Sequence, residues 1–369
     1  MNTSPDGAQQ SRRSLKWPLA AGAALVAVGL GAGLVYLDPF SPDPAAERAA
    51  SEEPEAPAYA GDHVLGYAWS EAWYNGDAQG VADDLAELWS EQIPQVAFET
   101  DTARDPAHDF AGLLGGVEGV RQDGPYRTDV LMSSNVFHHG VLHGTDAPGG
   151  EPVEGVEEVR VLGNVRPSGA LHFVVPADSG IRTLDDLAGR TVAIGEGAHP
   201  EDLESAAGLV LETAGLADRV AFVDDRDTPL GRGLFEEDVA DAYAIMDALP
   251  AGEVDTIDSL GYEVRVLDIG AGTAEEVAGE VSFYSPVAVD ARTYLGQEEE
   301  ITLVSTWDTL YAPPGLDGEL ARLLVETMYA GLAEATHGEW VRVENALVGI
   351  DPDTLHPGVR GYYEEQGLL

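Results

Sequence analysis

A glycine turn near residue 195 has residue types that could bind a ligand. The apolar run 191–194 leads into Gly195 and Gly197, and a helix-like segment opens at Pro200. In α/β proteins such a turn directs the first amide N–H groups of the helix into the space above the strand ends, where small anions bind. The turn by itself is equally consistent with a plain connection that holds no ligand.

A phosphate is a poor match to this turn. A P-loop requires a lysine after its glycines, and a dinucleotide-binding turn requires the pattern G-x-G-x-x-G. The turn has neither feature, and Glu196 would place a carboxylate against a phosphate. From this turn alone, contact of Gly197, Ala198 and His199 with another small anionic group and a tight turn without a ligand are about equally favoured.

Polar residues follow two other expected strands. Ser133, Ser134 and Asn135 end one apolar run, at the position where open α/β sheets bind ligands, although a plain turn explains them almost as well. Arg104 follows another run in a chain with few basic residues. Its guanidinium could hold a carboxylate through two parallel hydrogen bonds, or form an ordinary surface ion pair.

The histidines at 138, 139 and 143 raise the question of a metal, because positions 139 and 143 are one helical turn apart. The glutamate of an H-E-x-x-H motif and a third ligand are missing, so we expect exposed or capping histidines and no metal site. No G-x-S-x-G motif is present either. The sequence indicates no cofactor and no catalytic group, and we expect a protein that is not an enzyme.

Charge excludes one class of partner. The 369 residues include 66 acidic and 19 basic residues, for a formal charge of −47, which would repel a nucleic acid backbone. The acids are spread along the whole chain, which is typical of a protein from a salt-rich cell, since about 1 M salt shortens the screening length to ~3 Å. Cysteine is absent, so disulfides, thiolate metal sites and a lipid-bearing cysteine are absent too.

The first residues resemble an export signal. Arg12, Arg13 and Lys16 precede an uncharged stretch, 17–37, in the manner of a twin-arginine signal. This stretch is close to the ~20 residues that span a bilayer, so we expect residues 1–37 to remain as a membrane anchor that places the rest of the chain outside the cell. The acidic segment 38–61, rich in Pro, Ala and Glu, is expected to be an extended tether.

Beyond residue 62 the chain alternates short apolar runs with amphipathic ones, which predicts an α/β fold. The expected helices are 76–93, 106–117, 200–216 and 317–334, with a short helix at 182–189 that opens at Thr183. The expected strands are 63–69, 95–100, 127–134, 156–165, 170–177, 191–195, 219–224, 239–246, 262–269, 281–290 and 301–313.

Several stretches, taken in their order along the chain, resemble the conserved passages of a known protein family. "SGIRTLDDLAGRTVAIG" at 179–195 resembles the passage into the second lobe of extracytoplasmic solute-binding proteins. "SEAWYNGDAQGVADDLAELW" at 70–89, "TDVLMSSNVFHHGVLHG" at 128–144 and "LHPGVRGYYEEQG" at 355–367 narrow the resemblance to the TAXI receptors of tripartite (TRAP) transporters. The matches extend over nearly the whole expected folded part.

The resemblance implies a ligand cleft. Its walls would include Trp73 and Tyr74, with the polar neighbours Ser70 and Asn75. Asp109 stands near the position where the family has an asparagine. The chain departs from the family pattern at Pro106, and the small hydroxyl and glycine positions of the second cleft loop are replaced by Ala198, His199 and Pro200, so the substrates of related receptors do not transfer.

The resemblance also implies a two-lobed, type II periplasmic-binding-protein-like fold with two separate sheets and a hinge near His172 and Phe283. Lobe 1 would be 62–172 and 284–369, and lobe 2 would be 173–283. Such a receptor would bring a small organic anion, such as a dicarboxylate, keto acid or glutamate, to an ion-coupled TRAP permease. A membrane-anchored sensor domain, or an enzyme on the same scaffold, remains an alternative.

Overall fold

The computed structural model describes residues 63–69, 78–102, 106–115, 119–121, 124–126, 128–144, 153–194, 200–224, 240–259 and 261–369. The expected anchor, 1–37, and tether, 38–61, lie outside these ranges. All the described elements belong to one compact unit, Glu55–Leu369. Among the helices of the described ranges, none is both long and apolar enough to cross a membrane.

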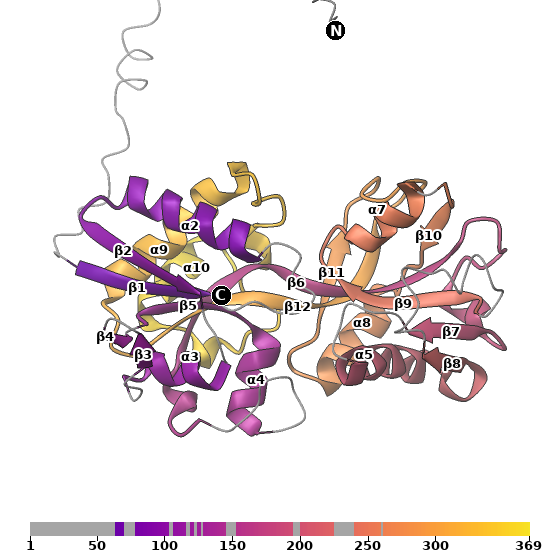
Figure 1. Ribbon diagram of the computed structural model, residues 1–369, viewed down its shortest axis with the longest axis horizontal. Coiled ribbons are helices and arrows are strands. Elements are labelled where there is room, and N and C mark those ends of the chain that lie inside the picture. The colour runs from indigo at the N-terminus through magenta and orange to yellow at the C-terminus, as the bar shows by residue number, and fades with distance from the viewer. Residues whose placement is uncertain are drawn as a thin grey trace, which may run out of the picture. The chain divides into compact units, whose positions relative to one another are not determined.

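A first group of parallel strands forms one end of the sheet. The central strand, β1 (His63–Trp69), lies between β2 (Val96–Thr102) and β5 (Val130–Ser134). Figure 1 shows α2 (Ala78–Gln92) on one side of these strands and α3 (Pro106–Leu113) and α4 (Asn135–His143) on the other. Val81, Leu85 and Trp89 recur at helical spacing on α2 and are fully buried, so their burial holds this helix against the sheet.

A second group of parallel strands forms the other end, with β7 (Thr191–Ile194) between β8 (Ala221–Asp224) and β9 (Ala242–Asp247). In Figure 1, α7 lies on one side of this group and α5 and α8 lie on the other. The bounds of the elements around it are α5, Pro200–Thr213; α7, Gly252–Ser259; β10, Val264–Val266; α8, Ala271–Glu280; and β11, Ser285–Val289.

Two long antiparallel strands, β6 (Arg160–Pro176) and β12 (Ile301–Ala312), connect the two groups (Figure 1). β12 pairs with β5 through 308–311, whereas β6 pairs with β9 through 170–174. The hydrogen bonding is therefore continuous from β2 to β8, in the order β2-β1-β5-β12-β6-β9-β7-β8. The expectation of two separate sheets is wrong, because the connecting strands also pair with each other and the two groups join that ladder at opposite ends.

The sequence predicts two strands, 156–165 and 170–177, where the structure has the single strand β6. Pro167 and Gly169 look like a break, but β12 pairs with β6 on both sides of them, with register shifts between Thr306 and Trp307 and between Asp308 and Thr309. These irregularities let the ladder pass the proline, which has no N–H to donate. Tertiary pairing therefore overrides the local signal.

The C-terminal segment packs on β6. His356 begins α10 (Pro357–Glu365), where its Nδ1 accepts from the N–H of Gly358 at 3.1 Å. The Tyr363 hydroxyl donates to the carbonyl of Leu162, and a Cβ at Gly163 would collide with the same hydroxyl. The signature "LHPGVRGYYEEQG" thus caps a helix and clamps it onto a connecting strand, which is a structural role.

The remaining elements are short or flank the sheet. Helix α9 spans Gly318–Gly331, close to the expected 317–334, and the strands β3 (Gly119–Arg121) and β4 (Gly124–Tyr126) form a separate pair. Thr183 opens a 3₁₀ turn at Leu184–Leu187 as predicted, with a capping box to Asp186. The other 3₁₀ turns are Val156–Glu158, Ala217–Arg219, Leu332–Glu334, Val343–Asn345 and Pro352–Thr354.

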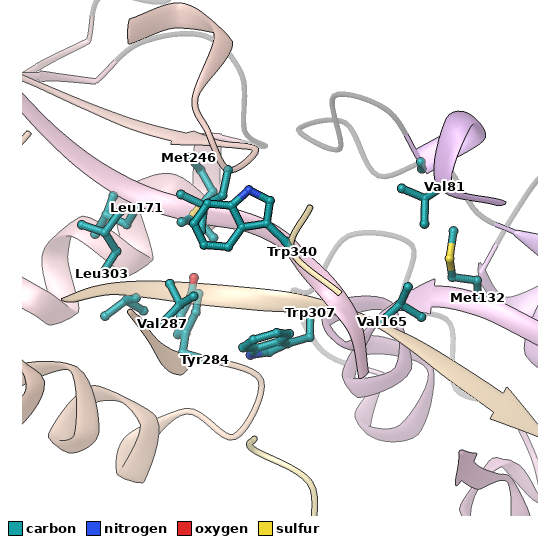
Figure 2. Close-up of a cluster of buried hydrophobic side chains, with 14 of the residues drawn as sticks. Val81, Met132, Val165, Leu171, Met246, Tyr284, Val287, Leu303, Trp307 and Trp340 are labelled. Atoms are coloured by element: carbon teal, nitrogen blue, oxygen red, sulfur yellow. The ribbon is translucent and has the colours of Figure 1, made fainter. Parts of the chain in front are cut away.

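The hydrophobic core continues along the connecting strands. Figure 2 shows Leu171, Leu303 and Trp307 from these strands, with Trp340 from the C-terminal segment on the opposite side of β12 from Trp307 in this view. Both tryptophans are buried. The predicted α/β fold class is confirmed, with a mixed sheet that helices cover on both sides.

Candidate functional site

The strand directions identify the place in the fold where a ligand would bind. β5 is antiparallel to β12, and β9 is antiparallel to β6. Because β6 runs from the first group to the second and β12 returns, the carboxyl ends of both parallel groups are directed at the junction between them. Ligands of open α/β sheets bind at such strand ends, so this junction is the candidate site.

The strand register gathers the predicted loops of the first group at one edge. Trp69 ends β1 beside Thr102 of β2 and Met132 of β5. The ends of β1, β2 and β5 therefore lie at the same edge of the sheet, and β5 leads directly into α4. The residues predicted in the loops after β1, β2 and β7 lie outside the described residues, and their ligand contacts stay predictions: Ser70, Trp73, Tyr74, Asn75, Arg104, Gly197, Ala198 and His199.

Ser134 is the N-cap of α4, and its Oγ accepts a 3.4 Å hydrogen bond from the N–H of Val136. The same hydroxyl lies 3.3 Å from the Oγ of Ser168, which lies 2.7 Å from the Oγ1 of Thr306. These three side chains are buried, and the hydroxyl chain joins β5, β6 and β12. In the structure Ser134 therefore supports the junction through protein contacts.

Asn135 also uses both ends of its amide on protein groups. Its Nδ2 donates to the carbonyl of Phe283 at 2.9 Å, and its Oδ1 accepts from the N–H of Trp307 at 3.0 Å. This side chain ties the start of α4 to β12 and to the segment that enters β11. In the structure this amide is bonded to protein groups, so contact of Asn135 with a ligand stays a prediction.

The two other predicted site residues in the described ranges are also buried. Asp109 lies on α3, which packs against β5 and α4, and is 1% exposed. Ser133 on β5 is equally buried and stands opposite Thr309 of β12. The structure brings Asp109, Ser133, Ser134 and Asn135 to one part of the first group, and contact with a ligand remains a prediction for each.

A buried ion pair beside the junction was not predicted from the sequence. Arg166 and Asp308 are opposite one another on β6 and β12, with 3.2 Å between the Arg166 Nε and the Asp308 Oδ2. Both side chains are at least nine-tenths buried, and the charge of Asp308 adds to the burial that raises the pKa of Tyr67. The available signal was a charged residue in the middle of each of two largely buried strands.

Two buried histidines are held neutral. Burial lowers the pKa of His172 to about 4, and the pKa of His138 to about 4 with a smaller contribution from the neighbouring histidines. The His172 Nε2 lies 2.7 Å from the hydroxyl of Tyr294, which in turn accepts from the N–H of Ala251. Because the carbonyl of Ala170, 2.8 Å from Nδ1, can only accept, the neutral ring carries its proton on Nδ1, and Nε2 accepts from the Tyr294 hydroxyl.

A hollow of about 780 Å³ lies away from the junction, between β10, the end of β6 and the loop before β12. Arg182 and Arg265 line it, and each donates to the carbonyls of Ala177 and Ile181 at 3.0–3.3 Å. These guanidinium groups hold the turn that follows β6. We therefore assign them a structural role.

The chain matches a known protein family over more than half of its length. The sequence profile of the NMT1-like family matches residues 139–367, more than half of the chain. The chain belongs to the NMT1-like family. The match includes both connecting strands, the second strand group and the C-terminal clamp, so it covers most of the elements that form the junction. No curated protein matches this NMT1-like chain.

Several solved structures are similar to the NMT1-like chain over 74–76% of its length. The periplasmic aliphatic sulphonate binding protein SsuA from Escherichia coli is 16% identical, with 76% of each chain covered and a TM-score of 0.41. The putative sulfonate-binding SsuA of Methylobacillus flagellatus KT is 14% identical, with 75% of this chain and 70% of that chain covered and a TM-score of 0.42. A substrate binding domain of a putative amino acid ABC transporter from Streptococcus pneumoniae is 12% identical, with coverages of 74% and 96% and a TM-score of 0.40. Similarity at this level does not indicate which ligand this chain binds.

Proposed function

We propose that this NMT1-like protein is the extracytoplasmic solute receptor of a membrane transporter. The observation that carries the proposal is the opposed direction of the two strand groups, whose carboxyl ends meet at a junction crossed by β6 and β12. Two groups joined in this way can close over a ligand by bending at the connecting strands, and a ligand that contacts both groups favours the closed form.

We propose two lobes, 62–172 with 284–369 and 173–283, so that each would hold one of the two strand groups. We infer that the hinge lies close to Gly169, because Ala170 pairs with both Ser305 of β12 and Asp247 of β9, where β6 passes from one group to the other. The hydroxyl chain of Ser134, Ser168 and Thr306 lies beside this point. We infer that bending occurs there, slightly before His172.

We propose a small organic anion, such as a dicarboxylate, keto acid or glutamate-like molecule, as the ligand. The start of α4 faces the junction, and Arg104 and the glycine turn 195–197 follow strands that end at it. Backbone N–H groups and one guanidinium can hold a carboxylate in a chain of charge −47 where salt screens the surrounding acids.

The proposed partner is an ion-coupled permease of the TRAP type. This part of the proposal rests on the TAXI resemblance of the quoted motifs. The N-terminal segment would keep the receptor at the outer surface of the cytoplasmic membrane. Binding and release require no covalent step, and the proposed site needs no cofactor.

Native mass spectrometry of the protein purified in volatile high-ionic-strength buffer tests the proposal. We expect a co-purified organic acid in a one-to-one complex that is recovered chemically unchanged after long incubation. Conversion of the molecule would indicate an enzyme on this scaffold. Failure of dicarboxylates, keto acids and glutamate to bind the emptied protein would rule out the proposed ligand class.

A further inference from the structure

Two histidines on α4 face one another outside the core. The ring centroids of His139 and His143 lie 4.4 Å apart at an interplanar angle of 50°. His138 is separate from this pair, because its ring packs 4.8 Å from Tyr311 and 5.2 Å from Phe110 inside the first strand group. The structure therefore divides the three histidines of the sequence into one core residue and one facing pair.

Both rings of the pair are accessible. His139 is half-buried and His143, in the last turn of α4, is exposed. The Nδ1 of His139 lies 3.4 Å from the Oγ of Ser282, which leaves Nε2 free to bind.

We propose that His139 and His143 form a two-imidazole site for a transition-metal ion of the Zn²⁺, Ni²⁺ and Cu²⁺ class. Residues four apart on a helix lie on one face, and this is the spacing by which the two histidines of H-E-x-x-H hold zinc. Imidazole nitrogen favours these ions over Mg²⁺ and Ca²⁺, which prefer oxygen ligands.

Water completes the coordination. Within the described ranges, no group of three His, Asp or Glu side chains has metal-binding geometry. A site with two protein ligands binds less tightly than a closed structural zinc site, which uses four. Such a site suits reversible loading, and it is independent of the solute proposed above.

Metal binding would act on the junction through His139. The His139 ring contacts the ring of Phe283 edge-on at 5.0 Å, and the carbonyl of the same Phe283 accepts from Asn135 at the start of α4. An ion held by His139 and His143 restrains the end of α4 next to this contact. The bound ion therefore stabilises the folded protein, and the gain grows with the logarithm of the free ion concentration once that concentration exceeds the dissociation constant.

Isothermal titration of the full chain, without a histidine tag, tests the site with Ni²⁺ and with Zn²⁺ in the presence of excess Mg²⁺. The Mg²⁺ occupies non-specific carboxylate sites on this acidic surface. We expect saturable one-to-one binding that His143→Ala weakens at least about tenfold. His108→Ala on α3 is the matched control and should bind as the unaltered chain does.

Cu²⁺ electron paramagnetic resonance gives a second readout that does not depend on affinity. We expect superhyperfine coupling to two nitrogens in the unaltered chain and to one in His143→Ala, whose exposed position leaves the packing of α4 intact. Unchanged Ni²⁺ affinity in His143→Ala, competition by Mg²⁺ at the titrated site, or a Cu²⁺ spectrum without nitrogen coupling would each overturn the proposal.

Discussion

The side-chain amide of Asn135 donates to the carbonyl of Phe283, 148 positions further along the chain, at 2.9 Å. The first residue of α4 is thereby tied to the segment that enters β11. The other end of the amide accepts from the N–H of Trp307 in β12. A single side chain therefore links the first strand group to two segments that connect it with the second.

The first prediction concerns this link. Asn135→Ala leaves the N–H of Trp307 and the carbonyl of Phe283 without their partner, and we expect it to lower the free energy of unfolding by about 1–3 kcal/mol. Denaturant unfolding in high salt measures the loss. Asn345→Ala is the control, because Asn345 uses its backbone carbonyl to accept from Asn164. An equal loss in both variants would contradict the role of Asn135.

The second prediction concerns the buried ion pair. Arg166→Met removes one partner of Asp308 and should cost about 3–5 kcal/mol of stability, since a buried charge then loses its counter-charge. The double variant Arg166→Met with Asp308→Leu should cost clearly less, because no charge stays buried. Denaturant unfolding of both variants checks the order. A double variant that is less stable than the single one would refute the explanation.

The third prediction follows from the pKa of His172, which burial lowers from 6.5 to about 4. Between these pH values the unfolded chain binds a proton at His172 and the folded chain does not, so stability falls as pH falls from about 6.5 to about 4. The shift corresponds to about 3 kcal/mol. Above pH 6.5 both states are neutral at this residue, and its contribution is constant.

The variant His172→Gln isolates this contribution. Its free energy of unfolding should change less with pH than that of the unaltered chain between pH 6.5 and 4, when both are measured at one high salt concentration. Parallel curves over this range would show that His172 does not titrate on unfolding as described.

The fourth prediction concerns the loop after β1. The combined change Trp73→Ala and Tyr74→Ala should weaken binding of the co-purified organic anion, because the two aromatic side chains are expected to form a wall of the ligand site. Titration calorimetry measures the affinity, and circular dichroism confirms that the fold is intact. Unaltered affinity would remove both residues from the site.

The fifth prediction concerns salt. With a formal charge of −47, we expect loss of helical circular dichroism on dialysis from about 1 M to about 0.01 M salt, as the screening length grows from ~3 Å to ~30 Å. Return of the signal when salt is restored would show that charge repulsion is the cause. A spectrum that is the same in both buffers would argue against adaptation to salt.

Much of the secondary structure could be predicted from local sequence patterns. The strands His63–Trp69 and Ile301–Ala312 and the cap at Thr183 lie where apolar alternation and capping residues predict them. Helices α4, α7, α8 and α10 were not predicted, because each has only eight to ten residues and shows an apolar period over fewer than three turns. Local patterns carry information about neighbours within a few residues, and these helices are defined mainly by packing.

The sequence by itself determined the α/β class, the large negative charge and the polar residues at the end of β5, because periodicity, composition and turn chemistry depend only on residues close together in the chain. Only the tertiary structure decided that β6 continues through Pro167, that Arg166 meets Asp308, and that His138 turns into the core while His139 faces His143. Each of these outcomes depends on groups that are distant in sequence or on which face of a helix is covered. The contacts that decide them, and the free energy of burial that favours them, exist only once the strands and helices pack together.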